Sequence, residues 1–357
     1  MKTNQNLLTI VMPLKGRHFY TEFWVSYALK ARLPFKLILA DGSKEDEIGQ
    51  FMGKNAKLLE GLDVEYLRFP FDATYADYYK KVLNTLSMVK TKYVVLLDND
   101  TFPVPSSLGA CIAFMESNAD HSCCRGAHVD FDFDSNGEII CDDVYLTKDD
   151  RTAGILKSFD QANAIERIES WSHYTHILYY NVHRMENMVR AWRTIVNNNF
   201  MDLTMTDFSI AVHALIGGKT RVLDGVYMMR HRGSPESVSA EMYRRLDIMD
   251  RVLSPRWTQE WAAGMEEVCD RICTEDAHQV REEVAERIRM AVKTYVSDRI
   301  FAHLQRKRTS VGTPKYAVRQ ISRQDIERSQ VDVGIYDLLK DLGKHPSARE
   351  ALVKTGV

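Results

Sequence analysis

Short apolar runs alternate with segments of helical periodicity through the first ~115 residues. The apolar runs, each of which predicts a β-strand, lie at residues 7–12, 35–40, 64–69 and 93–97. Between them, apolar side chains recur every three or four positions, which predicts helices. The run at 93–97 is apolar throughout, as expected of a parallel strand covered on both faces. This order predicts an α/β fold with a doubly wound, mostly parallel sheet.

The pattern is less regular between residues ~105 and 235 and becomes helical beyond ~238. The elements expected in the irregular part are a helix at about 105–118 and strands near 121–133, 138–146 and 221–229. Three apolar stripes at helical spacing follow, at 242–253, 261–272 and 280–296. We therefore predict an α/β domain over residues 1–238 and a helical C-terminal extension over residues 239–357.

Composition narrows the class of protein. The 357 residues are 45% hydrophobic and 27% charged, with a formal net charge of −2. This balance lacks the basic excess of nucleic-acid-binding chains, so no nucleic-acid partner is expected. Six cysteines without metal-site spacing indicate reduced thiols. No run approaches the ~20 apolar residues of a membrane span. We expect a cytoplasmic protein that would touch a membrane only peripherally, at its inner face.

Carboxylates follow two of the predicted strands, where ligands bind in open α/β sheets. Asp41-Gly42-Ser43 follows the second strand, and Asp98-Asn99-Asp100 follows the fourth. Two carboxylates two residues apart can bind one divalent cation, and Mg²⁺ or Mn²⁺ often shares such ligands with a substrate diphosphate. The alternative for the acidic motif is a polar turn between strand and loop.

With these features the chain resembles the GT-A glycosyltransferases of the family-2-like bacterial group over residues ~7–235. The matching segments are Pro13 in the opening strand, Ala40-Asp41-Gly42-Ser43, residues 93–100, Thr206-Asp207, Gly217-Gly218 and His231. The resemblance implies a GT-A fold and a nucleotide-sugar donor, with a UDP-sugar as the first choice. The helical extension has no part in it.

The resemblance also implies roles for particular residues. The donor-binding residues would be Pro13, Asp41, Asp98 and Asn99, with Asp41 at the nucleotide base. The family's usual Ala-Arg-Asn before the acidic motif is absent, and Lys81, at about that distance, would bind a phosphate instead. Asp98, Asp100 and His231 would hold the Mn²⁺ or Mg²⁺ ion. Asp207 would be the catalytic base, and Trp171 and His173, in a cluster with Tyr174 and His176, would bind the acceptor.

Several of these residues have a plainer interpretation. Asp41 fits an Asp-Gly turn, and Lys81 fits a solvated helix face. Thr206 could cap a helix that has Asp207 in its first turn. His231 could belong to a basic surface turn.

We predict transfer of a sugar from a nucleotide-diphosphate donor to a hydroxyl group of a glycan or lipid-linked glycan on the bacterial surface. The transfer would be metal-dependent and would invert the anomeric configuration. One alternative is a sugar-nucleotide nucleotidyltransferase, although residues 13–18 contain one glycine where such enzymes have a glycine-rich loop. The other is a non-catalytic, glycan-binding relative.

Two further expectations concern the helical extension. Its apolar stripes must pack on the catalytic domain, on each other or on a second copy of the chain, which would be a homo-oligomer. Residues 299–323 carry seven lysines and arginines and no acidic residue. This stretch predicts either a solvated connector or a salt-sensitive contact with an anionic membrane.

Overall fold

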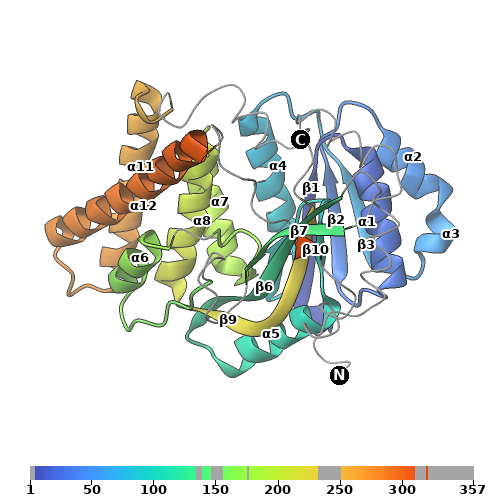
Figure 1. Cartoon of the computed structure of the whole chain (residues 1–357), viewed down its shortest axis with the longest axis horizontal. Helices are drawn as coiled ribbons and strands as arrows, with labels where there is room; N and C mark the ends of the chain where they lie inside the picture. Colours follow the sequence, from blue (N-terminus) through green and yellow to red (C-terminus); the bar gives the residue numbers. More distant parts are fainter. Residues whose placement is uncertain are drawn as a thin grey trace.

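The computed structural model describes residues 5–133, 139–145, 156–174, 177–231, 251–309 and 319–320. Four parallel strands form one half of its sheet, in the spatial order β3, β2, β1 and β4 (Figure 1). The bounds of these strands are Leu8–Leu14 for β1, Lys36–Asp41 for β2, Val64–Arg68 for β3 and Tyr93–Leu96 for β4. All four lie where the apolar runs predict strands.

Alternate strand residues face two hydrophobic clusters, so helices cover both faces of this half sheet. Ile10 and Leu39 face the cluster that contains α1, α2, α3 and α5. Val11 and Ile38 face the cluster that contains α4 and α7. The bounds of these helices are His18–Lys30 for α1, Glu47–Lys54 for α2, Ala56–Leu59 for α3, Tyr75–Met88 for α4, Pro105–Ser117 for α5 and Met185–Asn197 for α7. A short 3₁₀ helix at Gln5–Leu7 precedes β1.

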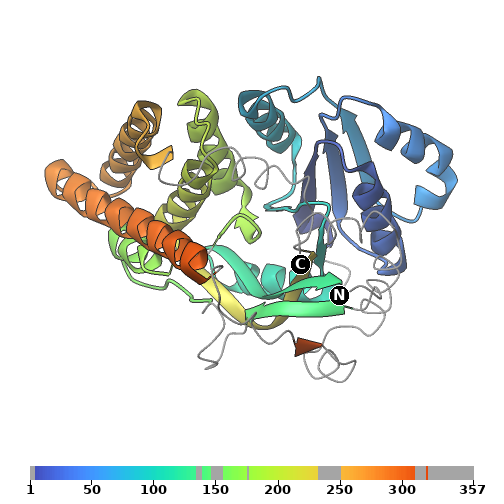
Figure 2. The same cartoon turned by 45° about the horizontal axis from the view of Figure 1, so that its top comes forward.

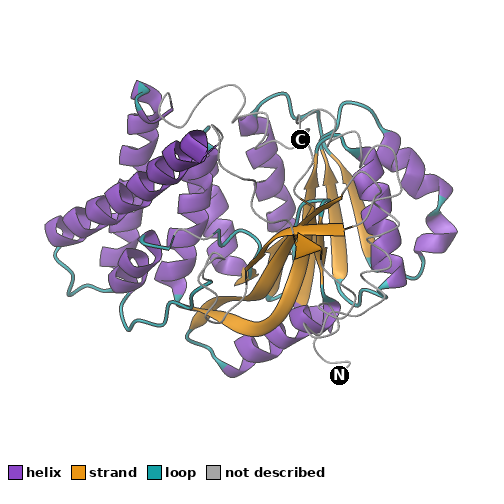
Figure 3. Ribbon diagram, viewed as in Figure 1, coloured by secondary structure: helices purple, strands orange, loops and turns teal. Residues whose placement is uncertain are grey.

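The other half of the sheet mixes parallel and antiparallel pairs. Strand β8 pairs antiparallel with β4 and β6, whereas the long strands β6 and β9 pair in parallel. Strands β5, β7 and β10 pair antiparallel with β9, β6 and β7, respectively. The bounds are Thr101–Pro103 for β5, His121–Phe133 for β6, Ile139–Tyr145 for β7, Val182–Arg184 for β8, Lys219–His231 for β9 and Arg319–Gln320 for β10. Figure 3 shows the strands as one curved sheet between two groups of helices. The predicted α/β class, a GT-A-like sheet followed by C-terminal helices, is confirmed.

The C-terminal helices share a core with helices of the α/β region. Helices α11 (Pro255–Glu275) and α12 (Arg281–Thr309) lie beside α6 (Ala164–Ser172) and α8 (Leu203–Gly217), at the opposite end of the molecule from α2 and α3 (Figures 1 and 2). Aromatic rings join them: Trp171 of α6 stacks on Tyr295 of α12, and Phe208 of α8 contacts Trp261 of α11. The apolar stripes at 261–272 and 280–296 therefore pack on the α/β region and on each other, two of the three arrangements expected.

Other expectations for the extension remain predictions. The predicted boundary at residue 238 lies outside the described residues, as do most of the stripe at 242–253 and much of the basic stretch 299–323. Within the part of the chain that is described, no helix is both long and apolar enough to cross a membrane.

Candidate active site

The acidic motif forms the turn between β4 and β5. Thr101 N–H donates to the carbonyl of Asp98 at 3.0 Å, which closes the turn. The side-chain amide of Asn99 donates to Thr21 Oγ1 of α1 at 3.0 Å, so it fastens the turn to α1 and is engaged by the protein itself. The carboxylates of Asp98 and Asp100 thus lie beyond the carboxyl end of a parallel strand, where the sequence predicts a ligand site.

Arginine and tyrosine side chains surround the two carboxylates. Tyr180 Oη donates to Asp98 Oδ2 at 2.6 Å, and Arg17 Nη2 donates to Asp100 Oδ2 at 2.7 Å. Desolvation, together with the neighbouring charge of Asp100, raises the pKa of Asp98. Desolvation alone would raise the pKa of Asp100 too, but the guanidinium groups of Arg17 and Arg230 lower it below its usual range. Asp100 is therefore held ionised.

The loop between β1 and α1 brings Arg17 to this position. Gly16 and Arg17 both have left-handed backbone conformations, with φ of 63° and 58°. Gly16 N–H donates to Ser43 Oγ at 2.8 Å, which ties the loop to the turn after β2. The Arg17 guanidinium lies 4.7 Å from the centre of the Tyr20 ring. A non-glycine residue rarely adopts this conformation without a local reason, because its Cβ is crowded there.

His231 lies beside the acidic motif, as the resemblance implies. Its backbone N–H donates to the carbonyl of Asp100 at 2.9 Å. Its ring is 1% exposed, stacks between Tyr20 and Phe131, and has Nδ1 3.1 Å from Tyr20 Oη. The alternative of a basic surface turn is therefore wrong for His231.

The donor chemistry of the site fits a divalent cation shared with a substrate. Among the residues that the structure describes, no three His, Cys, Asp or Glu side chains converge on one metal position. Mg²⁺ commonly uses one or two protein carboxylates and completes its shell with water and phosphate oxygens. Asp98 and Asp100 can supply those two carboxylates, although Asp100 would then share or release its contact with Arg17.

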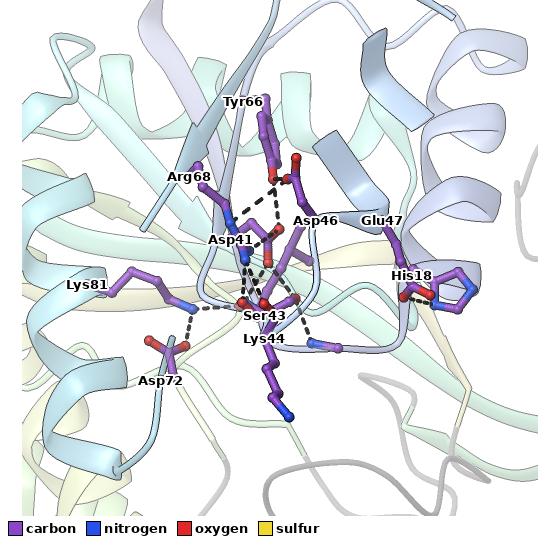
Figure 4. A network of polar contacts seen from close by, with 12 residues as sticks. His18, Asp41, Ser43, Lys44, Asp46, Glu47, Tyr66, Arg68, Asp72 and Lys81 are labelled. Atoms are coloured by element: carbon purple, nitrogen blue, oxygen red, sulfur yellow. Dashed lines mark hydrogen bonds and ion pairs between the residues drawn. The ribbon is translucent and has the colours of Figure 1, made fainter. Parts of the chain in front are cut away.

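Asp41, the residue expected at the nucleotide base, is fully enclosed by protein groups (Figure 4). One carboxylate oxygen accepts from the N–H and the hydroxyl of Ser43. The other accepts from Tyr66 Oη at 2.8 Å and Arg68 Nη1 at 2.9 Å. The turn interpretation describes this geometry better, since both oxygens of Asp41 order the loop after β2.

Lys81 lies in neither of the environments expected for it. Its side chain is 1% exposed, pairs with the equally buried Asp72, and donates to the carbonyl of Leu14 at 2.6 Å. The solvated-face interpretation is wrong, and the amine contacts a carboxylate in place of a phosphate. A Cβ at Gly42 would lie 2.4 Å from the Asp72 carboxylate, so only glycine leaves room for the pair of Lys81 and Asp72.

Asp207 lies inside α8 rather than at its start. The helix begins at Leu203, and its N-cap is Asp202, whose carboxylate accepts from Thr204 N–H at 2.7 Å. Thr206 Oγ1 instead donates to Tyr79 Oη of α4 at 3.1 Å. The helix-cap alternative is therefore wrong for Thr206, while the role of Asp207 as a base stays a prediction.

Pro13 lies in β1 beside Ala40 of β2, beyond the last β1–β4 pair, which is Val11–Leu96. Its missing N–H therefore breaks no pairing with β4. This position, close to the carboxyl end of the strand, agrees with the place that the resemblance gives it.

The predicted acceptor residues are not brought together on a surface. Trp171 is 1% exposed, and its ring lies 4.8 Å from that of Tyr295 and 6.0 Å from that of Phe208. It therefore offers no free face to a sugar, a correction to the prediction. His173, the residue that follows the end of α6, is exposed, and His176 lies outside the described residues.

Three residues at the site were not assigned from the sequence: Arg17, Tyr180 and Arg230. Arg230 lies in β9 directly before His231 and opposite Thr101 of β5, with its guanidinium 5.2 Å from the centre of the Tyr180 ring. The basic residues on either side of His231 are a local signal that could have indicated Arg230. Nothing in the sequence marks Arg17 or Tyr180, which are 83 and 82 positions from their partners.

Comparisons with known proteins add little to this geometry. No protein-family model and no curated protein matches the chain. Among solved structures, S. aureus TarS has a TM-score of 0.41 and 11% identity, covering 81% of this chain and 54% of that one. TarS 1-349 in complex with UDP-GlcNAc gives a TM-score of 0.39 and 11% identity, covering 81% and 89%. Its complex with UDP gives 0.38 and 13%, covering 98% and 91%. The chain thus spans about half of full-length TarS, and similarity this low identifies no activity.

Proposed function

We propose that this protein is a glycosyltransferase that transfers a sugar from a nucleoside-diphosphate donor to a hydroxyl group. The observation that carries this proposal is the pair Asp98 and Asp100 beyond the carboxyl end of β4, with the cationic side chains of Arg17 and Arg230 beside them. Two carboxylates can hold a divalent cation, and two guanidinium groups beside them suit the diphosphate that arrives with it.

In this proposal Asp98 and Asp100 hold a Mn²⁺ or Mg²⁺ ion, and His231 orders the motif through the carbonyl of Asp100. The ion, when bound, supplies positive charge to the departing nucleoside diphosphate. Asp207 takes the proton of the acceptor hydroxyl as that oxygen attacks the anomeric carbon. A single displacement of this kind inverts the anomeric configuration.

The donor and acceptor follow from the resemblance. We propose a UDP-sugar as donor, and a bacterial surface glycan or a lipid-linked glycan as acceptor. The structures of TarS 1-349 in complex with UDP-GlcNAc and with UDP make these two molecules sensible first probes.

The test measures UDP binding and UDP-sugar turnover with and without Mn²⁺ in the wild type, Asp100→Asn and Asp63→Asn. Asp63 is an exposed carboxylate between α3 and β3, so its substitution controls for a change of net charge. We expect Mn²⁺-dependent binding and turnover in the wild type and the control, and loss of both in Asp100→Asn. Turnover that survives both EDTA and Asp100→Asn would contradict the metal-dependent mechanism. Release of pyrophosphate from a nucleoside triphosphate and a sugar phosphate would indicate the nucleotidyltransferase instead.

A further inference from the structure

The side chain of Arg17 has hydrogen-bonding capacity that the protein leaves unused. It is 10% exposed, and one Nη donates to Asp100. Its Nε is buried and has no hydrogen-bond partner in the described structure. Nε and the neighbouring Nη of an arginine form a planar fork that binds two oxygens of a phosphate or carboxylate. Asp100 therefore uses one donor of the fork, and the buried Nε has no acceptor in the described structure.

Arg230, whose charge also acts on both carboxylates, repeats this feature. Its Nε is also buried without a partner among the described residues. Its guanidinium keeps its positive charge, because an arginine side chain is not deprotonated in proteins. A buried N–H without a partner is costly, so two of them at one site point to a ligand that completes them.

The charges explain why the two arginines lie beside the carboxylates. Asp98 and Asp100 carry two formal negative charges, and Arg17 and Arg230 carry two positive ones. A cation that takes over the carboxylates would release the arginines, and a diphosphate that arrives with it would then engage them. Arg17 can present both Nε and the Nη that Asp100 now uses to one phosphate only after Asp100 has released that Nη.

We propose that Arg17 and Arg230 form a clamp for the diphosphate, and that Arg17 exchanges Asp100 for a phosphate oxygen when the divalent cation binds. This inference rests on the proposed function, since it names how that donor is held. It assigns Arg17 two opposing effects. Arg17 competes with the cation for Asp100 when no diphosphate is present, and it strengthens binding of the diphosphate.

The backbone of Arg17 allows a clean test. Asparagine tolerates the left-handed conformation of this position better than most residues, so Arg17→Asn removes the guanidinium with little backbone strain. Arg32 provides the matched control, because it is another arginine with positive φ (49°) and its side chain is exposed. Arg17→Asn, Arg32→Asn and Arg230→Gln are compared with the wild type. Two titrations are made: Mn²⁺ alone, and inorganic pyrophosphate with Mn²⁺ present.

We expect Arg17→Asn to bind Mn²⁺ alone several-fold more tightly and pyrophosphate roughly 10- to 100-fold more weakly, the range of a lost charge-assisted hydrogen bond. Arg230→Gln should weaken pyrophosphate binding similarly, and Arg32→Asn should change neither constant. Weaker binding of both ligands in Arg17→Asn would show a merely structural role and overturn the exchange. Unchanged pyrophosphate binding in Arg17→Asn would overturn the clamp. UDP-sugar turnover by the wild type separates the two proposals. If the wild type turns over a UDP-sugar and Arg17→Asn binds pyrophosphate as tightly as the wild type does, only the clamp is refuted. A pyrophosphate site without turnover of any nucleotide sugar refutes only the glycosyltransferase.

Discussion

The buried pair of Lys81 and Asp72 gives a sharp prediction about stability. Both side chains are 1% exposed, and the pair joins α4 to the loop after β3, with Lys81 also donating to Leu14 at the end of β1. Removing one partner of such a pair leaves an uncompensated charge in a low-dielectric interior, which costs about 3–5 kcal/mol. We therefore expect Lys81→Met to lower the free energy of unfolding by that amount. The measurement is denaturant unfolding followed by circular dichroism.

Lys80 is the matched control, because it is the preceding residue of α4 and is exposed. Lys80→Met should change stability by no more than about 0.5 kcal/mol, as is usual for surface substitutions. The double variant Asp72→Asn/Lys81→Met should be more stable than Lys81→Met, because it removes the unpaired carboxylate. If Lys81→Met and Lys80→Met are equally stable, the pair contributes nothing and this reasoning is refuted.

Three other predictions concern packing, pH and catalysis. Gly42→Ala should cost at least about 1–3 kcal/mol by overpacking against Asp72, whereas Gly53→Ala, where no atom lies within 4 Å of the added Cβ, should not destabilise. Desolvation lowers the pKa of His213 to about 3, so this histidine folds neutral and protonates first in the unfolded chain. The stabilisation from a buried neutral histidine is fully present above its pKa in the unfolded chain. As the pH drops from 7.5 to 5.5, the free energy of unfolding falls by about 1.4 kcal/mol per buried histidine. His213→Gln should remove that part of the pH dependence in unfolding experiments. Asp207→Asn should retain UDP binding and slow transfer by roughly 10²–10⁴-fold, and unchanged steady-state turnover would exclude Asp207 as the base.

The strands and the acidic motif could be predicted because their signals are local. An uninterrupted apolar run such as 93–97 specifies a strand buried on both faces wherever the chain places it. The position of Asp98 and Asp100 follows directly, since residues after a parallel strand must lie at the carboxyl edge of the sheet. The same reasoning holds for the amphipathic stripes of α11 and α12, whose apolar faces had to be covered.

What the sequence could not determine depends on partners far along the chain. Lys81 was expected at a phosphate or on a solvated helix face, yet it is buried, and Asp72 from the loop between β3 and α4 compensates its charge. Trp171 was expected to bind a sugar, but Tyr295, 124 positions later, covers its ring.

The electrostatics of the site were likewise decided by tertiary structure. Arg17 and Tyr180 each lie more than 80 positions from the carboxylate that they contact. Local periodicity reports only which face of an element is buried. Which charges meet in the interior depends on how the loop after β1 and the end of β9 converge on the turn after β4, and only the folded chain brings those three segments together.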